Sequence, residues 1–349
     1  MAPMYHVFQD SDGKNLIGRK SMMSITKAKI LNEEIIKMTR RAFGENAEVE
    51  DIIELTGGFY NTAYMISFKD GQKVVLKISP MKDLKVMRYE KNLMETEVFV
   101  LDKMRSIKGV TVPCVLYYDR SVEITDNEFL FMEFLDGVPL NKIREELTED
   151  QYNAISSDLA EIIKNINGVE GEYFGYISQE NKRFTTWFEA FFCMIKELLD
   201  DAQDAGVSLP FENNKLYSMI NEQRDVLNQV EKPLLVHKDL WEGNILIDPK
   251  TFRITGILDC ERAIFGDTLL EPICGFLWEN KSFMNTYIGR EILTRDENIR
   301  FALYKIYVFL ISVIECTYRQ YPDENADKWA KLQLDEALEN LIKLQNKRT

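Results

Sequence analysis

Three oxygen-bearing side chains in the second half of the chain have types and a spacing that suit phosphoryl transfer. Asp239 stands five residues before Asn244, and Asp259 follows twenty residues after Asp239. A carboxylate can orient a hydroxyl nucleophile and accept its proton, and amide and carboxylate oxygens are ligands that Mg²⁺ prefers. The spacing predicts Asp239 as the catalytic residue and Asn244 and Asp259 as metal ligands. The alternative is a pair of polar turns in which the two aspartates cap backbone amides.

A lysine in an apolar run supplies a candidate phosphate anchor. Strand alternation places Lys77 on one face together with Val75. A cation on this face needs a partner, which nucleotide phosphates and a helical carboxylate would provide. Glu97 is the best carboxylate because it stands where the following helical run turns its apolar face inward, and Glu90 and Glu95 are alternatives. For an isolated lysine, an edge-strand side chain facing solvent is the other interpretation.

Two adjacent glycines precede this lysine. Gly57 and Gly58 join two strand-like runs, and without a Cβ their backbone amides can approach an anion closely. The pair is therefore a candidate phosphate-binding loop. The alternative is an ordinary turn.

The elements that must position these residues follow from hydrophobic periodicity. We expect an amphipathic helix over 24–43, strands over 52–55, 63–68 and 74–78, a helix over 87–105, and strands over 114–118 and 128–134. Helical spacing then covers 149–165, 186–203, 213–231 and 297–345. Strands and loops over 236–259 separate the last two of these helical regions. Strands first and helices later predict an α+β protein of two parts. A hairpin of two short strands would bring Asn244 and Asp259 side by side.

Charge and composition restrict the partners. The 349 residues are 45% hydrophobic and carry a formal net charge of -14. Nucleic acid and anionic membranes need a positive protein surface, so this charge disfavours both as main partners, whereas a cationic substrate is compatible with it. The alternative is that the acidity only promotes solubility.

Cysteine and histidine usage indicates the compartment. Five scattered cysteines form no Cys-x-x-Cys pair, and two histidines are too few for a His-rich metal site. We therefore expect reduced thiols and a cytoplasmic protein. The N-terminus lacks a signal-peptide pattern, no apolar run is long enough to span a bilayer, and no required protein partner is evident.

Joined in chain order, these pieces resemble the aminoglycoside phosphotransferase family of small-molecule kinases, which has the protein-kinase-like two-lobe fold. The matching segments are 57–61, 75–80, 131–137, 237–244 and 257–261, within residues 55–272. The resemblance implies an antiparallel-sheet N-lobe over 1–136 and a mainly helical C-lobe over 137–349. It also implies ATP or GTP as co-substrate, and Mg²⁺.

The resemblance assigns roles to individual residues. Asp239 corresponds to the catalytic aspartate, Asn244 and Asp259 to the Mg²⁺ ligands, and Lys77 with Glu97 to the phosphate-anchoring ion pair. The resemblance also implies further nucleotide contacts. Gly57, Gly58 and Asn61 belong to the phosphate loop, Met132 lies at the back of the purine pocket, and Glu133 and Leu135 belong to the hinge. A Gly-Asp pair at 266–267 resembles a family element that we interpret as structural support.

Departures from the family pattern leave the substrate open. Lys238 stands where many members have a small residue, and Cys260 replaces a frequent aromatic residue. Glu261 is a candidate contact for a cationic substrate, and the alternative is a salt bridge with Arg262 or Lys238. The implied function is phosphorylation of a small-molecule hydroxyl, with antibiotic resistance as the leading role. The alternatives are a metabolic kinase of choline, a sugar or another small alcohol, and a catalytically dead nucleotide-binding module.

Overall fold

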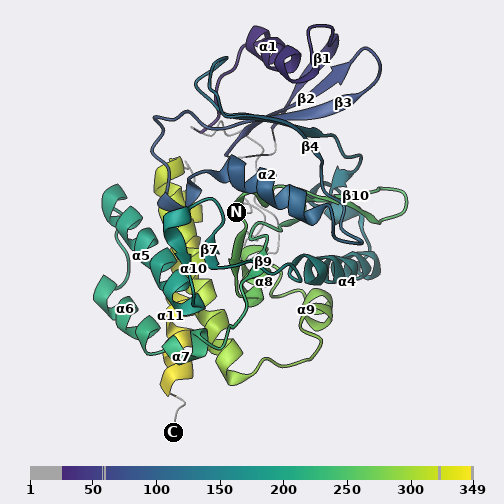
Figure 1. Ribbon diagram of the computed structural model, residues 1–349. Coiled ribbons are helices and arrows are strands. Elements are labelled where there is room, and N and C mark those ends of the chain that lie inside the picture. The colour runs from purple at the N-terminus through teal and green to yellow at the C-terminus, as the bar shows by residue number, and fades with distance from the viewer. Residues whose placement is uncertain (1–25, 57, 59, 321–323, 347–349) are drawn as a thin grey trace.

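An antiparallel sheet with its flanking helices lies over a larger helical part in the computed structural model (Figure 1), which describes residues 26–56, 58, 60–320 and 324–346. The sheet has the strand order β1-β2-β3-β5-β4, and all of its pairs are antiparallel. Its strands are β1 (Val49–Leu55), β2 (Thr62–Phe68), β3 (Lys73–Ile78), β4 (Val115–Asp119) and β5 (Phe129–Glu133). The predicted α+β class and the predicted sheet strands are confirmed.

Each face of this sheet packs against one helix. On one face, β3 and β5 bury alternate side chains with α1 (Asn32–Phe43). On the other face, Leu130 and Met132 of β5 contact Met94 of α2 (Leu93–Met104). Val75 belongs to this second cluster, so the alternation of β3 turns Lys77 toward α2.

Two predicted helices begin later than expected. Residues 26–31 are not helical, because Leu31 is extended and its N–H donates to the Glu34 carboxylate at 2.8 Å, which starts α1 at Asn32. Residues 24 and 25 lie outside the described part of the chain. The predicted helix over 87–105 begins at Leu93, because Asn92 is left-handed with a φ of 56°. The segment before it forms a short 3-10 turn, η2 (Arg88–Glu90), which packs against the helical part.

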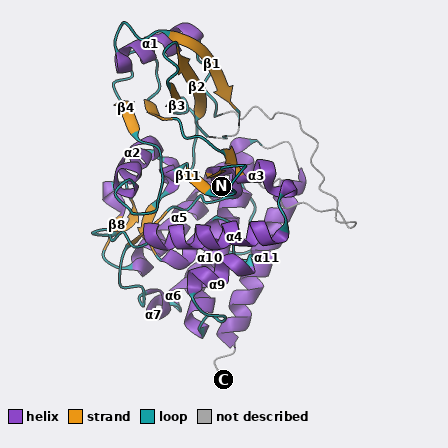
Figure 2. Cartoon of the chain, turned by 90° about the vertical axis from the view of Figure 1, so that its right-hand side faces the viewer, coloured by secondary structure: helices purple, strands orange, loops and turns teal. Residues whose placement is uncertain are grey.

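Nine helices follow in the described part of the chain: α3 (Leu140–Ile143), α4 (Glu149–Ile166), α5 (Trp187–Ala205), α6 (Asn213–Asn221), α7 (Arg224–Leu227), α8 (Glu271–Cys274), α9 (Lys281–Ile288), α10 (Arg295–Arg319) and α11 (Glu324–Asn346). Figure 2 shows how these helices gather below the sheet. The predicted helix over 213–231 is divided at Gln223, and both halves thereby bury apolar side chains in one core. No described helix is both long enough and apolar enough to cross a bilayer.

Short strands between the sheet and the helices carry the loops of interest. A three-stranded sheet has the order β11-β10-β6, and a four-stranded sheet has the order β8-β7-β12-β9. In the antiparallel pair of β10 and β11, Ile245 lies opposite Ile257, which confirms the predicted hairpin. The strands are β6 (Val138–Pro139), β7 (Phe174–Tyr176), β8 (Arg183–Phe184), β9 (Leu234–Val236), β10 (Ile245–Ile247), β11 (Ile254–Ile257) and β12 (Ile264–Gly266).

Candidate active site

The loop between β9 and β10 is clamped by a buried carboxylate at the start of α8. The two oxygens of Glu271 accept the backbone N–H groups of His237 at 2.6 Å and Lys238 at 2.8 Å. Glu271 is fully buried, and burial raises its pKa to about 7. Two backbone groups of the loop are thus fixed by one side chain from a distant segment. The sequence pattern did not identify Glu271.

His237 supports the same loop from within. Its imidazole is fully buried, and the Asp239 N–H donates to Nδ1 at 3.3 Å. Because Nδ1 accepts, Nε2 is the protonated nitrogen and donates to the Leu258 carbonyl at 3.0 Å. Burial lowers the pKa of His237 to about 4, so the ring is neutral near pH 7. This geometry supports a structural role, because it ties the Asp239 loop to the end of β11.

Asp239 and Asn244 lie at opposite ends of this loop and contact each other. The Asn244 amide donates to the Asp239 carbonyl at 2.8 Å and reaches its carboxylate at 3.4 Å. Both side chains are buried. The Leu258 N–H donates to the Asn244 carbonyl at 2.9 Å, which places Asn244 beside the residue before Asp259. The predicted trio is therefore brought together by the loop and the β10–β11 hairpin.

Lys77 joins the sheet to this trio. Its Nζ lies 2.5 Å from the Glu97 carboxylate and also contacts the carboxylate of Asp259. Burial disfavours its charge, but Asp259 and Glu97 outweigh that effect and raise the pKa of Lys77 well above its usual value. Of the three candidate carboxylates, Glu97 is the partner, whereas Glu95 pairs with Arg120 and Glu90 with Arg319.

The metal-ligand candidate Asp259 occupies an unusual backbone position. Its φ of 59° is left-handed, which turns the chain sharply at the end of β11. The carboxylate is 34% exposed, unlike the almost fully buried Glu97. One of its oxygens faces Lys77, and the partial exposure leaves the group accessible from solvent.

Glu261 bridges the two parts of the molecule. Its carboxylate accepts a hydrogen bond from the side-chain amide of Asn61 in the loop between β1 and β2. Burial raises the pKa of Glu261 to about 8. The predicted alternative of a salt bridge with Arg262 or Lys238 is wrong, because Arg262 faces other carboxylates and the described contacts of Lys238 include none with a carboxylate.

The remaining predicted nucleotide contacts surround the same region. Met132 is buried at the end of β5, and the Glu133 N–H donates to the Cys114 carbonyl at 2.9 Å. A Cβ on Gly256 would come within 2.7 Å of the Leu135 side chain, so Gly256 lets Leu135 pack closely over the β10–β11 hairpin.

The glycine loop is described only in part. Among the described residues, a Cβ on Gly58 would meet only the Asn61 carbonyl, at 3.7 Å. Gly57 lies outside the described residues. Asn61 of this loop contacts Glu261, which stands two residues after Asp259.

A charged network beneath the site was not foreseen. Glu90 in η2 contacts Arg319 of α10 and lies 3.8 Å from Arg262. Arg262 donates to the Tyr89 hydroxyl at 2.5 Å, and the Tyr60 hydroxyl donates to the Glu90 carbonyl at 3.0 Å. These contacts connect the glycine loop, the segment after β3 and the helical part. Their partners are separated by up to 229 residues in sequence, so no local pattern could reveal them.

The pair at Gly266 and Asp267 has the predicted structural surroundings. Asp267 accepts from Arg300 at 2.9 Å and from the Tyr304 hydroxyl at 2.6 Å, and it caps the Leu269 N–H at 3.0 Å. A Cβ on Gly266 would lie 2.7 Å from the Trp187 ring.

The model of the phosphotransferase enzyme family matches residues 51–289, more than half of the chain. The chain belongs to this phosphotransferase family. The family predicted from the sequence is thereby confirmed, and the matched range contains Glu97, Asp239 and Asp259.

The chain is 26% identical over 216 residues to a probable ketoamine kinase of Vibrio vulnificus (strain CMCP6). That match covers 57% of this chain and 65% of the relative, which is just under two thirds of the relative's length.

Solved structures show the fold that the phosphotransferase shares. A thermostable mutant of aminoglycoside phosphotransferase APH(4)-Ia superposes with a TM-score of 0.64 at 19% identity, covering 88% of this chain and 98% of that one. The same protein has also been solved with AMP-PNP and hygromycin B. A solved structure from Thermobifida fusca YX-ER1, provisionally named a fructosamine-3-kinase, superposes with a TM-score of 0.58 at 20% identity. The superposition covers 88% of this chain and 99% of that chain. These likenesses confirm the protein-kinase-like fold.

Proposed function

We propose that this phosphotransferase is a kinase that moves the γ-phosphoryl group of ATP or GTP to a hydroxyl of a small molecule. The observation that carries the proposal is the convergence of Asp239, Asn244 and Asp259 with the Lys77–Glu97 pair. These groups come from a rigid loop, a hairpin, a sheet strand and a helix. Phosphoryl transfer depends mainly on such positioning and on neutralising phosphate charge.

Each group has a distinct task in this proposal. Asp239 orients the acceptor hydroxyl for in-line attack on the γ-phosphorus and accepts its proton. Lys77, held by Glu97, positions the α- and β-phosphates. Glu133 and Leu135 contribute backbone groups to the purine, Met132 lies behind it, and the loop with Gly57, Gly58 and Asn61 covers the phosphates.

The residues also suit a magnesium ion. Asn244 and Asp259 offer one amide oxygen and one partly exposed carboxylate, which are hard oxygen ligands. The described residues include no cluster of three or more acidic, histidine or cysteine side chains that would bind a metal by themselves. This fits Mg²⁺, which is usually held by one or two carboxylates and the substrate phosphates. When bound, the ion would neutralise the transferring phosphates.

The acceptor class is the finer part of the proposal. The net charge of -14 supports a cationic acceptor such as an aminoglycoside, and hygromycin B is bound in one structural relative. The likeness to a ketoamine kinase supports an amine-bearing sugar instead. Choline and simple sugars are the other two candidate classes of acceptor. An assay of Mg²⁺-dependent nucleotide turnover against these four classes, with growth protection of a sensitive bacterium, distinguishes resistance from metabolism.

The decisive variant is Asp239→Asn, which keeps the size of the side chain and removes its basicity. We expect turnover to fall by about 100-fold or more, because general base catalysis contributes on this scale, while nucleotide affinity measured by calorimetry stays within about threefold. Asp158→Asn, on the exposed face of α4, is the matched control and should retain activity. Turnover near the wild-type rate in Asp239→Asn would refute the role. Absence of Mg²⁺-dependent nucleotide binding in the wild type would favour the dead binding module.

A further inference from the structure

The catalytic loop reaches solvent over three residues. Its flanks, over 235–240 and 244–247, are buried, whereas residues 241–243 are partly exposed. The proposed catalytic Asp239 stands two residues before this stretch, and Asn244, which contacts Asp239, comes directly after it. The exposed stretch is therefore the tip of a loop whose two ends meet at the proposed site.

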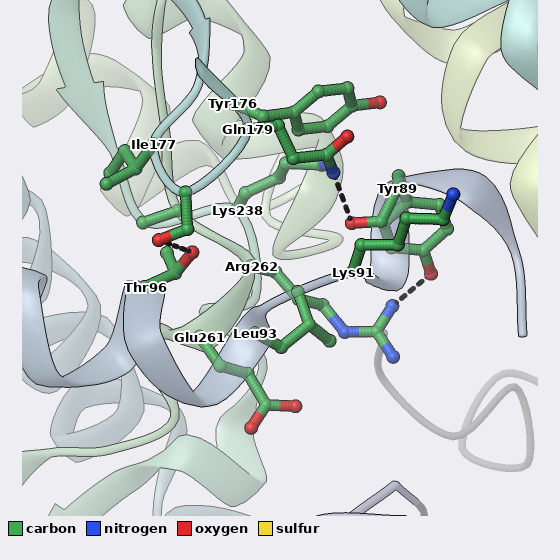
Figure 3. Close-up of a pocket in the computed structure, with 12 residues that line it drawn as sticks. Tyr89, Lys91, Leu93, Thr96, Tyr176, Ile177, Gln179, Lys238, Glu261 and Arg262 are labelled. Atoms are coloured by element: carbon green, nitrogen blue, oxygen red, sulfur yellow. Dashed lines mark hydrogen bonds between the residues drawn. The ribbon is translucent and has the colours of Figure 1, made fainter. Parts of the chain in front are cut away.

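The side of the loop that carries Lys238 offers no route to an acceptor. Lys238 Nζ lies 4.9 Å from the ring centroid of Tyr89 and 5.5 Å from that of Tyr176, and these side chains line a cavity together with Arg262 (Figure 3). The volume of this cavity is about 10 Å³, which is room for at most one water. This side is closed to a molecule of the size of a sugar, and such a molecule can contact the loop at 241–243.

Trp241 has the largest side chain of the exposed stretch, and its position is fixed. Its carbonyl accepts the Asn244 N–H at 2.9 Å, and the preceding Leu240 is fully buried in an apolar core. A Cβ added to Gly243 would overlap three neighbouring carbons of the indole ring at once. One face of the ring therefore lies against the Gly243 backbone, which only a glycine permits. The ring is a supported plate next to the proposed catalytic residue.

Core packing does not explain this tryptophan. Trp187 is fully buried in the helical core, and Trp278 and Trp329 pack against that core. Trp241 belongs to none of the hydrophobic clusters that the described residues form. A partly exposed tryptophan in such a position is typical of a binding surface, because its ring offers a large contact area.

The charges around the ring favour a cationic partner. Glu242 is turned toward α4, where it accepts the Tyr152 hydroxyl at 2.9 Å and lies 3.7 Å from Arg144. Arg144 is stacked over Tyr152, 3.5 Å from the ring centroid, so this cation is held by its own partners. The chain as a whole carries a formal net charge of -14. The face of an indole ring attracts ammonium groups, because the ring quadrupole is negative there.

We infer that the Trp241 ring is the acceptor platform of the proposed kinase and that it binds acceptors through an ammonium group carried near the reacting hydroxyl. This role rests on the proposed function, because it assigns the acceptor class of the same site. Amino sugars and amino alcohols are then preferred over neutral sugars. Trp241 is a specificity residue in this assignment and takes no part in proton transfer or in holding the nucleotide.

The first test is fluorine NMR of the whole protein labelled with fluorotryptophan, with Mg²⁺ and AMP-PNP present throughout. The chain has four tryptophans, and the resonance that disappears in Trp241→Phe belongs to this position. The probes are two pairs: glucosamine with glucose, and choline with dimethylbutanol, its uncharged carbon isostere. We expect the ammonium member of a pair to shift this resonance at concentrations about tenfold lower than its neutral partner does. Trp241 is not the platform if neither ammonium probe shifts its resonance more readily than the neutral partner.

Steady-state kinetics with an acceptor that is turned over provides the second test. Trp241→Leu should raise the KM of an ammonium acceptor by about tenfold and change kcat by less than about twofold, whereas Trp241→Phe keeps an aromatic face and should lose only part of this effect. Trp329→Leu makes the same change at another half-buried position and is the matched control, with the wild-type KM. Unchanged nucleotide affinity in calorimetry verifies that the Trp241 variants are folded.

The outcomes separate this role from the proposed function. A lower kcat at unchanged KM in Trp241→Leu would overturn the assignment, because the ring would then position the loop rather than bind the acceptor. Absence of turnover with every acceptor would refute the proposed function. The NMR shifts do not depend on turnover and would still decide the role of Trp241.

Discussion

At the scale of single residues, the site depends on buried groups that hold one another in defined protonation states. Lys77 is kept charged by Asp259 and Glu97, and His237 is kept neutral by burial. Glu271 fixes the backbone of the catalytic loop through two hydrogen bonds. The chemistry therefore rests on side chains whose charge is set by their neighbours.

The proposed role of the Lys77–Glu97 ion pair in phosphate placement can be tested by substitution. We expect Lys77→Met to lower kcat by roughly 100-fold, because a misplaced phosphate costs about that much in rate. Glu97→Gln should reduce kcat in the same direction but less. Steady-state kinetics with saturating nucleotide measures both effects. Glu95→Gln, on the exposed face of the same helix, should leave kcat unchanged, and unaltered kinetics in Lys77→Met would reject the anchor role.

His237 should make the folded protein sensitive to acid. Its folded pKa of about 4 lies below its ordinary value of 6.5, so the unfolded chain takes up a proton first as the pH falls. The free energy of unfolding should then decrease from about pH 6.5 to pH 4, by up to about 1.4 kcal/mol per pH unit. Urea titrations across this range measure the slope, and in His237→Gln this contribution should vanish. An imidazole that titrates near pH 6.5 in NMR spectra would contradict the prediction.

At the scale of elements, the segment between β3 and α2 connects the two parts of the molecule. Arg88 contacts Asp201 and Asp204 of α5, and Glu90 contacts Arg319 of α10. Tyr89 is buried in the helical core. Because α2 carries Glu97 and begins directly after this segment, its anchoring also fixes the partner of Lys77.

Removing the buried acid of this segment should be severely destabilising. Glu90→Ala leaves Arg319 and Arg262 to share the Glu315 carboxylate, and an uncompensated buried charge costs about 3–5 kcal/mol. Urea unfolding measures the loss. Glu95→Ala removes an exposed acid and should change stability by less than about 0.5 kcal/mol. Equal stability of the two variants would show that the segment is not a structural anchor.

At the scale of the whole molecule, residues of the proposed site connect its two parts. The Asn61–Glu261 and Lys77–Asp259 contacts both join the sheet to the helical part. If Asp259 binds Mg²⁺ with the nucleotide, the ion and Lys77 share one carboxylate. The stability of the complex should therefore depend on both ligands together.

This coupling can be measured by thermal shift. Nucleotide with Mg²⁺ at about 100 times its Kd should stabilise the wild type by about 2.7 kcal/mol. In Asp259→Asn we expect the nucleotide effect measured in EDTA to persist and the additional effect of Mg²⁺ to be largely lost. Asp248→Asn, at the exposed turn after β10, serves as the control and should respond like the wild type. A full Mg²⁺ response in Asp259→Asn would exclude it as a ligand.

The order of the chemical groups and the local elements that carry them could be predicted from the amino-acid sequence. The alternation of β3 placed Lys77 on one face with Val75, and the short runs around residue 250 predicted the hairpin beside Asn244. These features are local, because strand alternation and hairpin pairing depend on neighbouring residues. The spacing of Asp239, Asn244 and Asp259 was sufficient to propose their chemistry.

Which distant groups meet depends on how the helices and sheets pack. The choice of Glu97 over Glu90 and Glu95 depends on how α2 packs on the sheet, and its late start was set by the burial of η2 in the helical core. The role of Glu271 likewise became visible only when segments more than 30 residues apart were packed together. Buried charges find their partners through packing, and periodicity along the chain carries no information about that.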